Sequence, residues 1–369
     1  MSSITDPADT MAGDAGDDAA AGATARRRSL WVLAGVGLLL LALLLLPFLL
    51  KNYRVFQLTL VLVYAIAVLG LNLLTGYNGQ ISLGHGAFYA IGAYLAAILM
   101  ERFAMPYWGT LPVAFLACLA LGFLMGFPAL RLGGLYLALA TFALAVAMPQ
   151  MLKWKGIEHW TGGVQGIVLT KPEAPFEFSL LGAELGPDRW LFIFTLGIAA
   201  LMFWLAGNLV RGRIGRALIA IRDHPIAASA MGINLPIVKS LTFGISAAYT
   251  GVAGALGGIA VAFVAPDSFP AFLSLSLLVG AVVGGLGTIW GALFGAMFIQ
   301  FVPNIAEGIS KSAPAAIYGI CLIGLMYLAP TGVMGILRKV LARLRRRGPL
   351  ARSVAAFGLE EAEINRRTR

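Results

Sequence analysis

The chain of 369 residues carries a formal net charge of +10, and 59% of its residues are hydrophobic while only 12% are charged. This composition excludes an ordinary soluble domain, and several apolar runs are about as long as a bilayer is thick. Because these runs do not alternate apolar with polar residues, as the strands of a membrane barrel would, we predict an all-α, polytopic membrane protein.

The two ends of the chain are predicted to be cytoplasmic tails. Residues 1–29 are rich in Ala, Gly, Asp and Ser and have no apolar core, so we expect them to be disordered. The apolar run that follows lacks a small-residue cleavage site, which favours a retained first span over a cleaved signal. Residues 338–369 form a basic tail.

About ten membrane helices are expected between residues 30 and 337, some of them short or broken. Arg26–Arg28, Arg131 and Arg211–Arg222 fall on one side of the membrane when the crossings are counted, and an excess of Lys and Arg marks the cytoplasmic side. This pattern explains the positive charge without a nucleic-acid partner. The predicted spans lie near 30–50, 55–74, 81–100, 109–130, 133–151, 189–210, 241–264, 272–286, 288–303 and 314–337.

Glycines are frequent within these spans, and they have two interpretations. Small residues let membrane helices approach closely, so packing is the favoured explanation for clusters such as Gly251–Gly258. Clusters such as Gly284–Gly295 could instead mark helices that break around a transport path. Residues 272–303 are too long for one span, and we predict two short helices or a re-entrant pair there.

A polar stretch at residues 75–86, TGYNGQISLGHG, opens the third predicted span. Polar side chains at membrane depth are tolerated where protein or a water-filled cavity satisfies them. The stretch is therefore a candidate lining of a translocation path. The structural alternative is a satisfied helix start in which the histidine bonds to a neighbouring helix. The candidate path residues are Asn78, Gln80, Ser82 and His85.

A long connection at residues 152–188 is expected on the outer side of the membrane. It contains a glycine-rich segment that could contact substrate or an external partner, or could be an ordinary turn-rich loop. The candidate contact residues are Thr161, Gly162, Gly163, Gln165 and Gly166.

The segment 211–240 is predicted to be a cytoplasmic loop that contains a very short helix. Asp223 and His224 lie where a helix cap would, Pro225 suits the first turn, and Gly232 suits the stop. A helix of this length is hardly stable alone in water, so a partner protein is expected to hold it. The alternative is a solvated basic loop.

Several kinds of chemistry find no motif in this sequence. It has no GxxxxGK[ST] phosphate loop, no metal-ligand cluster and no paired acidic residues in the spans, so we expect no catalytic residue, no metal and no cofactor. Cys118 and Cys321 lie in apolar runs and are interpreted as packing residues. An energy source outside this chain is therefore expected.

Five segments, taken together and in order, resemble the LivM-type permease subunits of bacterial branched-chain amino acid ABC importers. They are TGYNGQISLGHGAFYAIGAYLAA (75–97), RLGGLYLALATFALA (131–145), TGGVQGI (161–167), GRALIAIRDHPIAASAMGINLPIVKSLTFGISAAYTGVAGALGG (215–258) and VVGGLGTIWGALFGA (282–296). The resemblance covers roughly residues 30–337, and it implies the ABC importer permease fold in a bacterial inner (plasma) membrane.

The resemblance also implies partners. These are a related LivH-type permease, two cytoplasmic ATPase subunits that bind the ATP, and an external solute-binding protein. Residues 215–232 would be the coupling loop that docks on an ATPase, although His224 and Pro225 stand where acidic or small residues are more usual. The implied coupling residues are Gly215, Arg216, Ala217, Ile221, Arg222, Asp223, Ala227, Ala228, Met231 and Gly232.

Branched-chain amino acids are the default substrates of this family. Related permeases serve urea, short amides or other amino acids. A channel or secondary carrier without an ATPase is the alternative of a different class, and a membrane scaffold without substrate flux is a third.

Overall fold

The computed structural model describes residues 45–129, 134–175, 179–180, 183–309 and 314–346. Most of the first predicted span, the N-terminal tail and residues 347–369 of the C-terminal tail lie outside these ranges, as does Arg131. The described part is mostly helical, which confirms the predicted fold class.

Except for longer connections at residues 153–186 and 212–234, short connections separate ten long helices in the described ranges. They are α2 (Asn52–Asn72), α3 (His85–Phe103), α4 (Tyr107–Ala129), α5 (Leu135–Leu152), α7 (Pro187–Arg211), α10 (Leu235–Val261), α11 (Ala271–Gly284), α12 (Gly291–Ile309), α13 (Pro314–Leu328) and α14 (Gly332–Arg346). The shorter helices are a π-helical turn η1 (Leu73–Tyr77), α6 (Glu158–Thr161), α8 (Arg213–Asp223), α9 (Pro225–Ala230) and a 3₁₀ turn η2 (Pro266–Ser268).

Four two-residue strands form two small ladders. β1 (Ile167–Val168) pairs antiparallel with β4 (Phe263–Val264), with Ile167 opposite Val264. β2 (Ser179–Leu180) pairs with β3 (Ala183–Glu184), also antiparallel. The first ladder joins the predicted outer loop to the segment that follows α10, so it is a contact between residues far apart in the sequence.

Eight helices in the described ranges are long and apolar enough to cross a membrane. Each corresponds to one predicted span. A ninth, α12, coincides with the predicted span 288–303, but Gln300, Asn304 and Glu307 make its second half more polar. With the first span outside the described ranges, the expectation of about ten membrane helices, some of them short, agrees with this arrangement.

The last predicted span, 314–337, differs from a single continuous helix. It is interrupted at residues 329–331, between α13 and α14. Pro330 cannot continue the helical hydrogen bonding, and Gly332 adopts a φ of 72°. A side chain at Gly332 would collide with the backbone of Gly285, so this turn packs closely on the end of α11.

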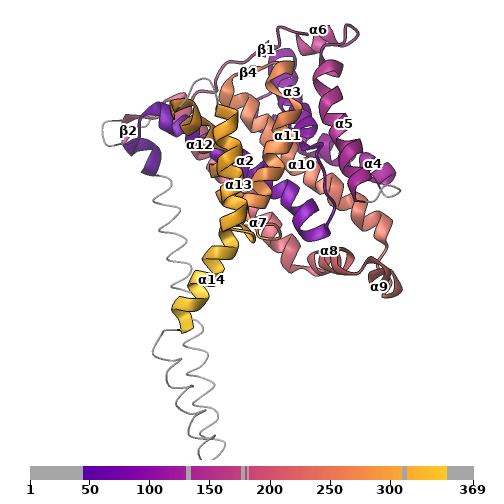
Figure 1. The fold of residues 1–369 in the computed structure, drawn as a ribbon. Coiled ribbons are helices and arrows are strands. Elements are labelled where there is room, and N and C mark those ends of the chain that lie inside the picture. Colours follow the sequence, from indigo (N-terminus) through magenta and orange to yellow (C-terminus); the bar gives the residue numbers. More distant parts are fainter. Residues whose placement is uncertain (1–44, 130–133, 176–178, 181–182, 310–313, 347–369) are drawn as a thin grey trace, which may run out of the picture.

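Helix α10 forms the centre of the bundle and packs against α2, α3 and α4 (Figure 1). Its glycines allow this close approach, because a Cβ atom at Gly251 would meet Cys118, and one at Gly254 would meet the backbone of Tyr89. The packing interpretation of this cluster and of Cys118, which is fully buried, is therefore confirmed. Cys321 is instead exposed in the described chain.

The two ends of the bundle are built differently (Figure 1). One end carries α6 and the β1–β4 ladder, and the opposite end carries α8 and α9. The predicted outer loop and the predicted cytoplasmic loop thus lie at opposite ends of the helices that connect them.

Candidate functional site

The element α8–α9 was predicted only in part. The sequence predicts one very short helix in this loop, whereas the structure has an eleven-residue helix, α8, before it. Leu218 and Ile221 are buried on one face of α8, while Arg216 is exposed on the other. The helical spacing of Ile214, Leu218 and Ile221 is the signal that would have predicted α8.

Helix α9 has the expected start and stop. Pro225 occupies its first turn, His224 precedes it with an extended backbone, and Gly232 ends the turn with a φ of 83°. His224 makes no side-chain cap bond, so the proline and the glycine define this helix.

The two faces of α9 are unequal. Ala228 is only 4% exposed and faces the body of the chain, whereas Ile226 is 83% exposed and Met231 is 84% exposed. Any partner that reaches α9 from outside therefore meets Ile226 and Met231 together with the exposed Ala227. Ala228, like Gly215 and Ile221, is directed inward, because these residues hold the element against the bundle.

Arg222 joins this element to the end of α2. Its Nη1 donates to the carbonyl oxygen of Gly76 at 2.8 Å, and its Nε donates to Asp223 Oδ1 at 2.9 Å. Gly76 lies in the π-helical turn η1, and a π turn displaces carbonyl groups from the regular helical pattern. The bond therefore connects residues that are 146 positions apart in the sequence.

Asn72, at the end of α2, joins η1 to the turn between α11 and α12. Its Nδ2 donates to Thr288 O at 2.8 Å, and its Oδ1 accepts from the Gly287 amide at 2.9 Å. The side chain is fully buried, and a Cβ at Gly76 would collide with both Asn72 and Gly287. Nothing local in the sequence distinguishes this asparagine, so it is not among the residues predicted from the sequence.

The four candidate path residues do not form a single site. His85 is fully buried, with Nε2 2.6 Å from Ser246 Oγ and Nδ1 3.0 Å from Ser82 Oγ. Because the Ser246 hydroxyl donates to Gly70 O, it must accept from His85 Nε2, which leaves Nδ1 to accept from Ser82. Ser82 and His85 thus satisfy each other inside the bundle, as in the structural alternative.

Asn78 and Gln80 lie apart from that pair, at the edge of a polar pocket. Gln80 Nε2 is 3.5 Å from the Lys239 carbonyl, and Thr75 Oγ1 donates to the Gln80 carbonyl at 3.0 Å. The pocket has a volume of about 200 Å³ and lies between the 78–81 linker, the start of α5, the α8–α9 junction and α10.

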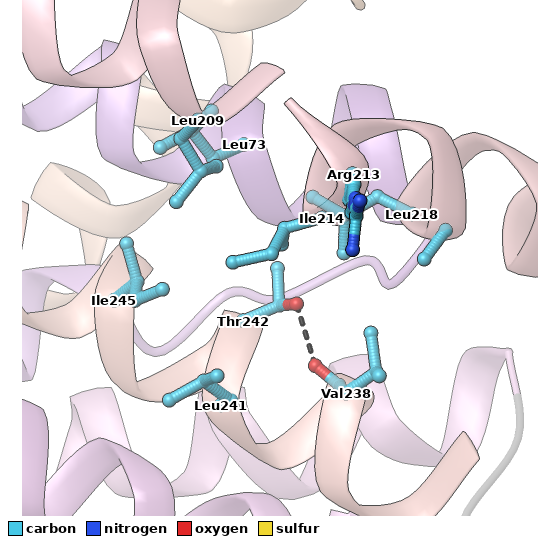
Figure 2. Close-up of a pocket in the computed structure, with 10 residues that line it drawn as sticks. Leu73, Leu209, Arg213, Ile214, Leu218, Val238, Leu241, Thr242 and Ile245 are labelled. Carbon is cyan, nitrogen blue, oxygen red and sulfur yellow. Dashed lines mark hydrogen bonds between the residues drawn. The ribbon is translucent and has the colours of Figure 1, made fainter. Parts of the chain in front are cut away.

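A second pocket, of about 230 Å³, lies between α7, α8 and α10. Figure 2 shows its lining, which is apolar apart from Arg213 and Thr242. The Thr242 hydroxyl is already used, because it donates to Val238 O at 2.6 Å. This pocket offers few polar groups for recognition and separates α8 from the membrane helices.

The predicted outer-loop contact residues form a compact turn. Thr161 is buried, and its hydroxyl donates to Leu152 O at 2.9 Å. Gly162, Gly163 and Gly166 all have positive φ angles, so backbone geometry accounts for these glycines. Gln165 has the exposed side chain among the five candidates.

No group of three or more His, Cys, Asp and Glu side chains that could hold a metal ion occurs within the described ranges. An ion pair joins Lys153 to Asp267 at 2.6 Å, between the end of α5 and η2. Another joins Lys171 to Asp188 at 2.7 Å. Both connect loops and helix ends.

Comparison with known proteins gives a family match over most of the chain. Residues 53–330 match the family described as the permease component of branched-chain amino acid transport systems. The high-affinity branched-chain amino acid transport system permease protein LivM of Escherichia coli (strain K12) is 33% identical over 310 residues, which cover 79% of this chain and 72% of the relative.

More distant relatives are similar over nearly as much of the chain. The permease protein BraD of Pseudomonas aeruginosa is 26% identical over 300 residues, which cover 74% of this chain and 91% of the relative. The permease protein LivH of Escherichia coli (strain K12) is 25% identical over 291 residues, with the same coverage of 74% and 91%. No solved structure gave a significant match.

Proposed function

Because this chain belongs to the family of permease components of branched-chain amino acid transport systems, we propose that it forms half of the membrane path of an ATP-driven importer. Its substrates are branched-chain amino acids. The chain is a transport subunit rather than an enzyme, and ATP is bound and hydrolysed by partner subunits.

The observation that carries this proposal is the exposed face of α9. Ile226 and Met231 are large apolar side chains that are more than four-fifths exposed, beside the charged residues Arg222 and Asp223. A short helix with an apolar face and a polar edge is suited to a groove in another protein. We propose that this groove belongs to a cytoplasmic ATPase subunit and that α9 is the coupling helix.

Movement of α9 has a route into the membrane part. Arg222 connects the α8–α9 junction to Gly76, and Asn72 connects the same end of α2 to the turn after α11. When the ATPase subunits close, a displacement of α9 would therefore reach α2 and α11 as well as its direct neighbour α10. Two discrete arrangements of these contacts would open the path to one side of the membrane at a time, which is alternating access.

The similarity to relatives named LivM and to relatives named LivH supports a second, related permease subunit as the other half of the path. Basic residues around α8 orient this end toward the cytoplasm, with both termini on that side of the inner membrane. The turn around Gln165 then faces outward, where a solute-binding protein would deliver the amino acid.

The coupling proposal is tested with Ile226→Asp and a matched control, Val168→Asp. Both side chains are exposed and apolar, at 83% and 72%, but they lie at opposite ends of the bundle. We expect Ile226→Asp to insert normally and to reduce recovery of the ATPase subunits in co-purification at least tenfold, an effect of about 1.4 kcal/mol, with a parallel loss of uptake.

Val168→Asp should retain the ATPase subunits. Equal recovery of the ATPase subunits with Ile226→Asp and with the unaltered chain would contradict the assignment of α9. A channel or carrier predicts that uptake persists when the ATPase subunits are omitted, so this measurement separates the two classes of mechanism.

Competition for uptake among leucine, urea and short amides decides the substrate class. The proposal predicts that leucine, isoleucine and valine compete best.

A further inference from the structure

The polar pocket beside the α8–α9 junction has an unusual wall. Asn78 is only 2% exposed, and neither its Nδ2 nor its Oδ1 has a hydrogen-bond partner among the described residues. A buried amide without partners is costly, so a group that supplies both an acceptor and a donor would be bound favourably there.

The charge of the pocket selects the sign of that group. Arg222 and Lys239 line it, and no acidic side chain is among its described lining residues. Asp223, which pairs with Arg222, lies outside the lining. A ligand carboxylate could therefore accept from the Lys239 ammonium and from Asn78 Nδ2.

The rest of the pocket has two further features that a ligand would need. Asn78 Oδ1 is an acceptor that a ligand ammonium could satisfy. Leu137, Ile221 and Pro225 line another part of the same pocket and would contact an aliphatic side chain. The pocket therefore combines groups for a carboxylate, an ammonium and a hydrocarbon within about 200 Å³.

From these contacts we infer that the pocket binds a free aliphatic α-amino acid from the cytoplasmic side of the membrane. The inference rests on the proposed function, which supplies the orientation and the class of substrate. Because the walls come from the 78–81 linker, α5, α8–α9 and α10, a bound amino acid would hold the coupling element in one position relative to the linker. The pocket would be a site from which the transported amino acid is released to the cytoplasm.

The test is binding of radiolabelled leucine to the full-length chain in lipid nanodiscs, without the solute-binding protein. Asn78→Asp keeps the shape of the side chain but places a negative charge beside the ligand carboxylate. Lys239→Met keeps most of the aliphatic stem and removes the ammonium. The control is Gln57→Ala, which removes an amide near the start of α2, where Gln57 bonds only to Tyr53 in the described structure.

We expect the unaltered chain and Gln57→Ala to bind leucine equally. Asn78→Asp and Lys239→Met should bind it at least tenfold more weakly. Unlabelled 4-methylpentanoate, which lacks the amino group, and isoamylamine, which lacks the carboxylate, should each compete at least tenfold less well than leucine.

Undiminished leucine binding by Asn78→Asp would overturn the site, as would absence of leucine binding to the unaltered chain. If unlabelled inorganic phosphate competed with radiolabelled leucine as well as unlabelled leucine does, the proposal that the pocket recognises an amino acid zwitterion would be wrong. The pocket would then be a general anion site. Association with the ATPase subunits, measured with Ile226→Asp, is independent of these outcomes, so the two proposals can fail separately.

Discussion

The crossing of α3 and α10 allows a quantitative test of the packing. A Cβ atom at Gly92 would collide with the carbonyl group of Gly251, which belongs to the facing helix. The obstacle is backbone rather than the flexible end of a side chain, so α3 and α10 must move apart. Overpacking of a well-packed core costs about 1–3 kcal/mol.

Gly207→Ala is the matched control for Gly92→Ala. Gly207 lies in α7, and no atom outside its own helix neighbourhood lies within 4 Å of a Cβ placed there. In a helix interior an exposed Gly→Ala change is favourable by up to about 1 kcal/mol. The two substitutions add the same methyl group, so the difference between their stabilities measures the contact at Gly92.

The measurement is thermal unfolding of the chain in detergent, followed by tryptophan fluorescence. A loss of 1 kcal/mol lowers the melting temperature of a large domain by about 2–4 °C, so Gly92→Ala should lower it by about 2–12 °C. Gly207→Ala should leave it unchanged or raise it slightly. Equal melting temperatures for the two variants would refute the argument that α3 and α10 meet through backbone contact.

Two further substitutions test contacts that hold the ends of the bundle. Asn72→Ala leaves the Gly287 amide and the Thr288 carbonyl without their partner, and it should lower the stability by about 1–3 kcal/mol per unpaired group, measured by thermal unfolding. Asn304→Ala, which removes an exposed amide, is the control and should lower the stability far less. Gly166→Ala places a methyl group against the Val264 carbonyl at a φ of 72°, so the contact between the outer loop and the segment after α10 should loosen. Hydrogen exchange at the Leu169 amide, which donates to Ala262 O, should then become faster, and unchanged protection would argue against this contact.

Helix positions along the chain could be predicted from the sequence because apolar runs of bilayer length are a strong and local signal. The start of α9 at Pro225 and its stop at Gly232 were also predictable from local signals, since proline fixes its own φ and glycine permits the positive φ at which a helix can end. Prediction was weaker wherever a role depends on a contact between distant segments.

The residues around η1 show this limit. Asn72 resembles any other polar residue near the end of an apolar run, yet its amide bonds to the backbone more than two hundred positions later. Ser82 and His85 are close to Asn78 in the sequence, but His85 is bonded to Ser246 on α10 within the bundle core. The sequence does not show which of several neighbouring polar groups finds a distant partner.

The face of α9 is a further example. Ala227 and Ala228 are identical in chemistry and adjacent in the chain, but one is exposed and the other is 4% exposed. A substitution at Ala228 would therefore perturb the attachment of α9 to its own chain rather than test docking. Ile226 and Met231 are the residues whose substitution tests docking, because their side chains remain exposed when α9 packs on its own chain.

The π-helical turn at the end of α2 makes the number of residues there as important as their identity. Removal of one residue from 73–77 would rotate everything beyond it by about 100° relative to α2. The Gly76 carbonyl would then no longer face Arg222, although each amino acid nearby could be unchanged. Over evolutionary time this segment should therefore accept exchanges of residue more readily than insertions or deletions, because its spacing keeps the coupling element in register with the membrane helices.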